Sequence, residues 1–247
     1  MKPLLEIKDL VGGYTHKDVL HGISFDLYPN EIVGLIGLNG AGKSTTIKHI
    51  IGLMQAKKGT VSVNGETFHT NPTSYRNQMA YIPETPILYD ELTLYEHLRL
   101  TAMAYDIPEE LFEQRLPPLL KEFHLERQIN WFPVHFSKGM RQKVMIMCAF
   151  LIEPPLYIVD EPFVGLDPLG IQSYLELMDE MKENGSGILM STHILATAEK
   201  YCDRIVIIHE GKIKALGTLF ELQEQFQMED ASLDELYVEL TKVDSHV

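Results

Sequence analysis

The front third of the chain carries the apolar pattern of short strands interrupted by one helix. Three apolar segments are bounded by polar or turn-forming residues and predict strands: residues 4–10, 22–28 and 31–37. A fourth segment, TVSVNGETF, predicts a hairpin that turns at Asn64 and Gly65. Ahead of that hairpin, apolar residues recur at the spacing of a helix with one buried face: Ile47, Ile50, Ile51 and Met54. This part of the chain therefore contains a strand, a loop and a helix in succession.

The pattern changes to helical between about residues 85 and 136. Thr93 and Glu96 have the spacing of a capping box, which predicts a helix start. Pro108 is suited to open a second helix, and Pro117 with Pro118 predicts an interruption of it. We expect this region to form an inserted helical lobe.

Strands and helices alternate over the rest of the chain, as in α/β proteins. The segments LYIVD and GILMST predict buried strands, at residues 156–160 and 187–192. An amphipathic helix lies between them, marked by Ile171, Tyr174, Leu175 and Met178. RIVIIHEGKIKALG predicts a hairpin turning at Glu210 and Gly211, and the acidic end containing LDELYVEL predicts a helix. The whole pattern predicts one α/β core with a strand-rich front and a helical insertion.

Composition narrows the class of protein. With 247 residues, 45% apolar and 23% charged, the chain should fold as an ordinary globular protein. A net charge of -14 disfavours nucleic acid as a partner. Cys148 and Cys202 lack CxxC spacing, so we expect two free thiols in a reducing compartment. The longest uncharged apolar run is about nine residues, against the roughly 20 that a membrane helix needs, so we expect a cytoplasmic protein without a membrane span.

The segment GLNGAGKST, residues 37–45, predicts a phosphate-binding loop. Gly37, Gly42, Lys43 and Ser44 match the pattern GxxxxGK[ST] between a predicted strand and a predicted helix. Glycines let backbone N–H groups surround phosphates, the lysine reaches the terminal phosphates, and the serine hydroxyl can bind magnesium.

Two further strand ends carry candidate chemistry. LYIVDEP ends a buried strand in Asp160 and Glu161, and the following proline favours an extended conformation at Glu161, so that the two carboxylates point in different directions. Asp160 can then hold magnesium while Glu161 draws a proton from an attacking water. His193 follows the strand GILMST, where α/β sheets place their ligands, and can donate a hydrogen bond to a γ-phosphate.

A second helix start is typical of an anion site. In FSKGM, Ser137 and Gly139 stand directly ahead of the apolar run VMIMCAFLI. The ordered set GLNGAGKST, YIPE, FSKGM, LYIVDEP, GLD and STH resembles the ATP-binding subunits of ABC transporters over nearly the whole chain. Within that family, YIPETP, HFSKGMRQKVMIMCAF and STHILATAEKYCD look more narrowly like the Ecs-type ATPases.

The resemblance implies a fold and a division of the chain. It implies the ABC ATPase fold: a P-loop NTPase core with a parallel sheet, an antiparallel β subdomain at the front and an inserted helical lobe. The implied organisation is a single ATP-binding domain, residues 1–247, with the inserted helical subdomain at about 85–150 and a C-terminal hairpin plus helix at about 204–247.

The resemblance also implies ligands and roles. ATP and Mg²⁺ are the implied cofactors, with Glu161 and His193 as catalytic residues. Ser44, Glu84 and Asp160 would face the metal, and Tyr14 would stack on adenine. Ser137 and Gly139 would complete the site of a second ATP-binding subunit, either another copy of this chain or a similar subunit, and Asp167 would communicate across that interface. The loop residues implied in nucleotide binding are Gly37, Leu38, Asn39, Gly40, Ala41, Gly42, Lys43, Ser44 and Thr45.

Four residues depart from the family pattern. Glu84 replaces a usual glutamine, so it binds metal more tightly, slows hydrolysis near phosphate charge, or turns outward. Lys138 and Met140 replace a glycine and a glutamine of the signature, and Lys138 either contacts an anion or faces solvent. Lys143 replaces an arginine, which keeps the charge and gives up bidentate geometry.

Other protein classes share part of these motifs. A soluble ABC-type ATPase acting on ribosomes or DNA would share the nucleotide motifs, but the chain has one compact unit and an acidic balance. A P-loop kinase would not explain FSKGM. We therefore expect an ATPase at the cytoplasmic face of the membrane that drives an integral membrane subunit of the Ecs type, with residues 85–105 docking that subunit and export as the direction. The cargo is not encoded in this chain.

Overall fold

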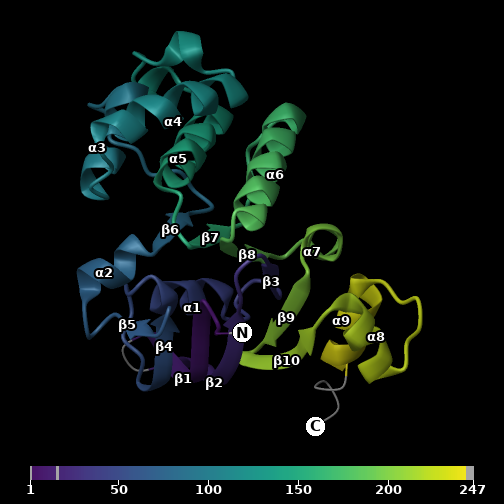
Figure 1. Ribbon diagram of the computed structural model, residues 1–247. Coiled ribbons are helices and arrows are strands. Elements are labelled where there is room, and N and C mark those ends of the chain that lie inside the picture. Colours follow the sequence, from purple (N-terminus) through teal and green to yellow (C-terminus); the bar gives the residue numbers. More distant parts are fainter. Residues whose placement is uncertain (1, 15–16, 243–247) are drawn as a thin grey trace.

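An antiparallel sheet forms the front of the molecule. The computed structural model describes residues 2–14 and 17–242 (Figure 1). The sheet has the strand order β2-β1-β4-β5, with every neighbouring pair antiparallel. Its strands are β1 (Leu5–Tyr14), β2 (Lys17–Leu27), β4 (Lys58–Val63) and β5 (Glu66–Thr67). Asn64 and Gly65 both have positive φ and join β4 to β5, which confirms the predicted hairpin.

A second sheet, in the order β10-β9-β3-β8-β7-β6, forms the centre of the molecule. Strands β9, β3, β8, β7 and β6 are parallel, and β10 is antiparallel to β9. The strands are β3 (Ile32–Ile36), β6 (Met79–Ile82), β7 (Leu156–Asp160), β8 (Gly187–Thr192), β9 (Arg204–His209) and β10 (Lys212–Gly217). Because parallel strands end at one edge, the segments after β3, β6, β7 and β8 come together there.

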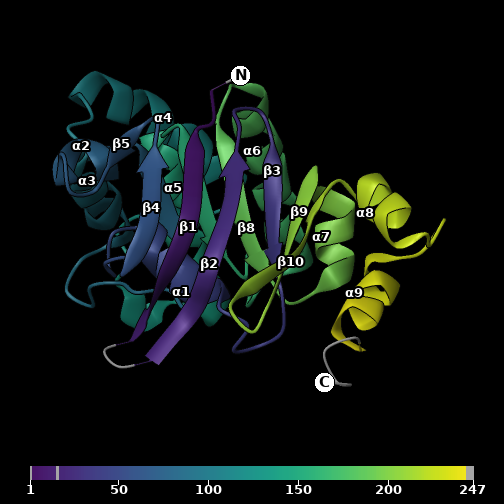
Figure 2. The same ribbon diagram turned by 90° about the horizontal axis from the view of Figure 1, so that it is seen from below.

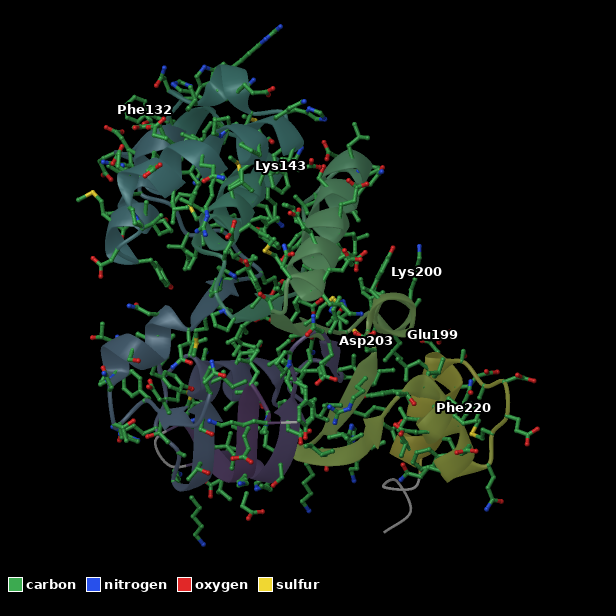
Figure 3. The ribbon with its side chains drawn as sticks, in the orientation of Figure 1. Phe132, Lys143, Glu199, Lys200, Asp203 and Phe220 are labelled. Atoms are coloured by element: carbon green, nitrogen blue, oxygen red, sulfur yellow. The ribbon has the colours of Figure 1, made fainter. Side chains whose placement is uncertain are left out.

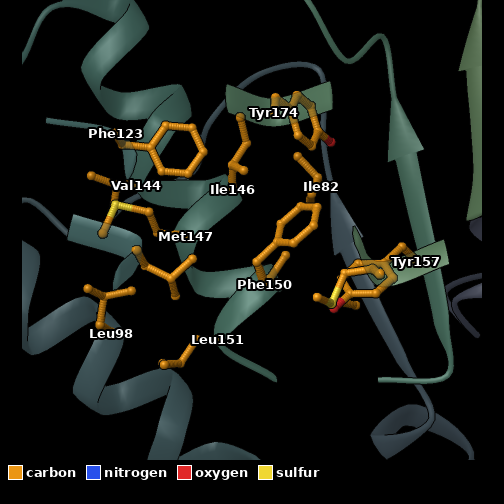
Figure 4. Close-up of a cluster of buried hydrophobic side chains, with 14 of the residues drawn as sticks. Ile82, Leu98, Phe123, Val144, Ile146, Met147, Phe150, Leu151, Tyr157 and Tyr174 are labelled. Carbon is orange, nitrogen blue, oxygen red and sulfur yellow. The ribbon is translucent and has the colours of Figure 1, made fainter. Parts of the chain in front are cut away.

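The helical insertion lies between the paired strands β6 and β7 and projects away from both sheets (Figure 1). It contains α3 (Leu94–Ala104), α4 (Glu109–Glu122), α5 (Lys138–Ile152) and two short 3₁₀ turns, η1 (Glu126–Gln128) and η2 (Pro133–His135). Apolar side chains of α3 and α5 share one core with β6, β7 and α6 (Pro168–Glu183), as Figure 4 shows for Leu98, Phe150, Tyr157 and Tyr174. The insertion is therefore packed onto the central sheet through α5.

The central sheet is covered on both faces. Leu156 and Ile158 of β7 share a core with the antiparallel sheet and with Ile47 and Ile50 of α1 (Lys43–Ile50). Tyr157 and Val159, which point to the other face, pack against the insertion and α6. A short helix, α2 (Pro72–Asn77), precedes β6. Because both faces of β7 are packed, the strand is held firmly, and the carboxylates at its end have a fixed position.

The C-terminal part packs against the other end of the same sheet. Helices α7 (Leu195–Tyr201), α8 (Leu219–Phe226) and α9 (Leu233–Lys242) form a third core with β3 and β9 (Figure 2). The predicted hairpin is confirmed, with Glu210 and Gly211 between β9 and β10. The sequence predicted one C-terminal helix, whereas the structure has two.

Two predictions about helices are wrong. Pro117 and Pro118 lie inside α4 instead of interrupting it. Both prolines are exposed, while Phe112 and Leu116 on the same helix are buried, so the carbonyls that lose their partners can face water. The helix α1 ends at Ile50, with Ile51 as its cap, so Met54 lies beyond the helix that the apolar spacing predicted.

Both cysteines are free thiols, as expected. Burial raises the pKa of Cys148 to about 11 and that of Cys202 to about 12, which makes neither thiol reactive at neutral pH. Within residues 2–14 and 17–242, no helix is long and apolar enough to cross a membrane.

Candidate functional site

The glycine loop joins β3 to α1 and is tightly enclosed. A Cβ on Gly37 would lie 2.3 Å from the carbonyl oxygen of Ile208, so only glycine fits there. Gly42 has φ of 118° and is the N-cap of α1, a conformation that L side chains rarely adopt. These constraints fix the loop over the N-terminus of α1.

The N-terminus of α1 has the chemistry of a phosphate site. Gly42 provides no side-chain cap, so the first N–H groups of α1 are available to an anion. Lys43 is buried, and its Nζ donates to the Gly37 carbonyl at 2.7 Å. The predicted loop residues other than Gly37 and Ala41 line a cleft of about 320 Å³ together with Tyr14; its lining is Tyr14, Val19, Leu38, Asn39, Gly40, Gly42, Lys43, Ser44 and Thr45. The cleft suits a bound phosphate group.

Tyr14 ends β1 at the rim of this cleft. Its side chain is 52% exposed, which leaves a ring face available for stacking. Lys48 of α1 donates from Nζ to the Tyr14 hydroxyl at 3.0 Å, and its ammonium lies 5.3 Å from the ring centroid. The hydrogen bond from Lys48 is the main cause of a lowered pKa at Tyr14. Lys48 thus holds the tyrosine that the sequence assigned to adenine.

Asp160 and Glu161 lie at the carboxyl end of β7, both buried. Burial raises the pKa of the Asp160 carboxyl, and the neighbouring Glu161 and Glu84 carboxylates act in the same direction. Burial lowers the pKa of Lys43, and Glu161, Asp160 and Glu84 oppose that shift. Glu161 itself has φ of 50°, in the left-handed region, so the extended conformation expected from the following proline is wrong. Three acids and one lysine therefore meet at the edge of the sheet beside the glycine loop.

His193 contacts Glu161 directly. The backbone N–H of His193 donates to Glu161 Oε1 at 3.0 Å, and its Nδ1 lies 2.7 Å from the same oxygen. The hydroxyl of Thr192 donates to Glu161 Oε2 at 3.2 Å. This arrangement fixes the carboxylate of Glu161 between β7 and β8. The sequence predicted both residues for the site but not their contact with each other.

The oxygen donors of the site fit magnesium. Glu84 follows β6 and is exposed, and its charge influences the pKa of both Asp160 and Lys43. The Ser44 hydroxyl and the carboxylates of Asp160 and Glu84 are hard oxygen ligands, which Mg²⁺ prefers. Among the described residues no cluster of three His, Cys, Asp or Glu could bind a metal by itself. The donor set therefore fits an ion that also takes ligands from phosphate.

Ser137, Gly139 and Asp167 lie apart from the residues that line the cleft. Ser137 caps α5 by accepting from the Met140 N–H at 3.2 Å, as predicted. A Cβ on Gly139 would lie 2.7 Å from the Gly165 carbonyl oxygen, in the loop that follows Glu161. These contacts place the second predicted anion site beside the loop between β7 and α6.

Asp167 is the N-cap of α6. It accepts from the Gly170 N–H at 2.7 Å, which lowers the pKa of its carboxyl more than the nearby Lys143 does. Lys143 of α5 lies 3.4 Å from the same carboxylate and is labelled in Figure 3. The lysine that departs from the family pattern therefore joins α5 to the start of α6.

Two residues of the site were not predicted from the sequence, Lys48 and Thr192. Lys48 is 34 residues from Tyr14 in the chain, and nothing in the apolar pattern pairs them. Thr192 belongs to the segment STH, which was predicted to lie at the site because of His193. Nothing in that segment predicted the hydrogen bond from Thr192 to Glu161.

Comparison with known proteins adds independent information. Residues 20–164 match the family described as ABC transporter. The chain is 66% identical over 242 residues to the ABC-type transporter ATP-binding protein EcsA of Bacillus subtilis (strain 168), with 98% of each chain covered. It is 33% identical over 210 residues to the SkfA peptide export ATP-binding protein SkfE of the same strain, covering 85% of this chain and 87% of that one. A solved structure of the ATP-binding subunit of an ABC transporter has a TM-score of 0.94 at 65% identity and covers 96% of this chain and 99% of its own.

Proposed function

This chain belongs to the ATP-binding proteins of ABC transporters and couples ATP hydrolysis to transport, and from that premise we propose which of its residues do the work and with which partners. The proposal is that Mg-ATP binds at the glycine loop, that Glu161 serves as general base, and that closure of two such subunits drives a separate membrane-spanning subunit.

The observation that carries the catalytic assignment is the fixed carboxylate of Glu161. It is buried, close enough to Lys43 for their charges to interact, and held by His193 and Thr192. A carboxylate in this position can take a proton from water that attacks the γ-phosphate. His193 orients Glu161, and its ring can turn to the γ-phosphate when ATP is present. Lys43 and the N-terminus of α1 hold the phosphates, and Tyr14 stacks on adenine.

Metal binding is assigned to Ser44, Asp160 and Glu84. When bound, Mg²⁺ neutralises phosphate charge and orients the phosphates for in-line attack. The raised pKa of Asp160 supports this assignment, because a buried carboxylate among like charges gains most from a cation. A bound cation would favour the ionised form of the Asp160 carboxyl.

A second copy of the chain supplies the other half of each site. Ser137 and Gly139 do not line the cleft at the glycine loop of their own chain. Ser137 caps α5 at the start of a helix of 15 residues, where N–H groups and the helix dipole favour an anion. The arrangement supports a head-to-tail dimer in which each signature segment meets the ATP of the other copy, with Asp167 at the interface.

The inserted lobe is the proposed docking surface for an integral membrane subunit of the Ecs type. Residues 85–105 contain four exposed large apolar side chains: Ile87 at 76%, Tyr89 at 62%, Leu100 at 42% and Met103 at 65%. A membrane partner would cover them and hold the chain at the cytoplasmic face of the membrane. We propose export as the direction, which is supported by the similarity to SkfE, a peptide export ATP-binding protein.

The test is to purify the tagged Glu161→Gln variant from detergent-solubilised membranes with ATP and Mg²⁺ and to identify the proteins bound to it. We expect a polytopic membrane protein at near one-to-one stoichiometry, and a purified variant that binds ATP but hydrolyses it at least roughly 100-fold more slowly than the unsubstituted chain. Undiminished hydrolysis would refute the role of Glu161. Recovery with ribosomes or DNA and no membrane protein would favour the alternative, a soluble ABC-type ATPase.

A further inference from the structure

The C-terminal helix α9 contacts the glycine loop. The backbone N–H of Leu38 donates to the hydroxyl oxygen of Tyr237 at 3.2 Å, across 199 residues of sequence. Leu38 is the second residue of the loop, two residues after the end of β3. Tyr237 is 5% exposed, so the hydrogen bond is made by a side chain with little freedom to move. A distant element is therefore joined to the backbone of the loop.

Helix α9 is itself held in place from two sides. Leu233, Leu236 and Tyr237 share a core with Ile36 at the end of β3 and with β9. The N–H of Leu233 donates to Glu199 Oε2 of α7 at 2.7 Å, and Figure 3 shows Glu199 on the side of α7 that faces α8 and α9. Helix α7 begins two residues after His193. Tyr237 thus projects from a helix that is anchored to β3, β9 and α7.

Other hydrogen bonds hold carbonyls at the start of the loop: Lys43 Nζ donates to the Gly37 carbonyl and the Ala41 N–H donates to the Leu38 carbonyl. The bond to Tyr237 fixes the Leu38 N–H. The side chain of Leu38 is 57% exposed and packs little. Gly37 precedes Leu38, and Gly40 follows it by two residues. Glycine gives a backbone more conformational freedom than any other residue. A loop that binds phosphates through its N–H groups gains affinity when its conformation is fixed before the ligand arrives. The Leu38–Tyr237 hydrogen bond supplies such a constraint.

We propose that Tyr237 is a positioning residue for the phosphate loop, so that the affinity for ATP depends on helix α9. The proposal rests on the assignment of the glycine loop as the ATP phosphate site. Tyr237 acts on ground and transition states alike, because it fixes the loop and does not touch the reacting atoms. Its loss therefore changes KM and leaves kcat at saturating ATP unchanged.

The experiment compares Tyr237→Phe with Tyr75→Phe in the full chain, measuring ATP affinity by calorimetry, KM and kcat for ATP hydrolysis, and Tm. Tyr75 is the matched control: its buried hydroxyl donates to the Ile50 carbonyl at 2.6 Å, at the opposite end of α1 from the loop. Each substitution removes one hydroxyl and keeps the ring. We expect Tyr237→Phe to weaken ATP binding by roughly three- to tenfold, the value of one hydrogen bond. Tyr75→Phe should lower Tm and leave ATP affinity unchanged.

Two results would overturn the proposal: wild-type ATP affinity in Tyr237→Phe, or an equal loss of affinity in both variants, which would mark a general loss of stability. A third variant, Lys43→Ala, separates this proposal from the one it rests on. If Lys43→Ala abolishes ATP binding while Tyr237→Phe has no effect, only the role of Tyr237 is refuted. If Lys43→Ala binds ATP normally, the phosphate-loop assignment fails and the role of Tyr237 fails with it.

Discussion

Glu84 adds a negative charge where the family pattern has a neutral glutamine. Its carboxylate is exposed at the end of β6, yet it contributes to the raised pKa of Asp160 and opposes the lowered pKa of Lys43. The Glu84 side chain therefore lies close enough to Asp160 and Lys43 for its charge to act on both groups. With no metal bound, one more carboxylate repels phosphate; with metal bound, it attracts the cation.

Substituting Glu84 by Gln should therefore change the dependence on magnesium. We expect the Mg²⁺ concentration for half-maximal ATP hydrolysis to rise by roughly three- to tenfold, because a nearby carboxylate is lost. The measurement is a magnesium titration of the ATPase rate at fixed ATP. Glu91→Gln, on an exposed carboxylate of the same segment, serves as control and should leave the titration unchanged. An identical titration for Glu84→Gln would show that Glu84 points away from the metal.

Three helices begin with the same device, a capping box or its equivalent. Glu96, Glu221 and Glu235 each accept from the backbone N–H of the capping residue three positions earlier: Thr93, Thr218 and Ser232. That bond is the main cause of a lowered pKa at each glutamate. A group whose folded pKa lies below its unfolded value of about 4.3 stabilises the protein above that pH and stops doing so as pH falls.

The triple variant Glu96→Gln, Glu221→Gln and Glu235→Gln should have a flatter pH dependence of stability below about pH 4.5. Glutamine also completes a capping box, so the variant should fold at neutral pH. The measurement is the free energy of unfolding by urea between about pH 3 and pH 7, for both proteins. An unchanged slope would mean that other carboxylates set the acid sensitivity.

Local signals in the sequence predicted helices and strands well. Contacts between residues far apart in the chain could not be predicted from it. The capping box of Thr93 and Glu96 lies within four residues, so its spacing alone identifies α3. The break expected at Pro117 and Pro118 did not occur, because burial of the apolar face of α4 outweighs two lost backbone bonds on its exposed face. The family and the fold followed from motif order, whereas Tyr237 could not, since 199 residues separate it from Leu38.

The net charge of the whole molecule would oppose the proposed association of two copies. Two copies at -14 each repel one another at long range, and salt screens that repulsion. In the proposed dimer, closure over ATP would have to overcome this repulsion. The dimer should therefore become tighter as ionic strength rises. An association driven by opposite charges becomes weaker under the same change.

We expect the ATP-bound Glu161→Gln dimer to become at least roughly threefold tighter when the ionic strength rises from about 0.01 to about 0.15 M. Sedimentation velocity over a range of protein concentrations measures the dissociation constant. Sodium and choline chloride should act alike if screening is the cause. A dimer that weakens with salt would indicate that attraction between local patches at the interface exceeds the repulsion of the net charges.

The helical insertion leaves and re-enters the central sheet through adjacent strands. Ile82 at the end of β6 is paired with Val159 of β7, and Met79 with Leu156, so the lobe leaves this parallel ladder at one end and returns to it at the other. Because the pairing of β6 with β7 sets the strand order, a different lobe joined between these two strands would keep that order if it kept the packing of α5 on the sheet. Since the lobe carries the surface proposed for the membrane partner, exchanging such lobes offers a route by which one ATP-hydrolysing framework serves many transporters.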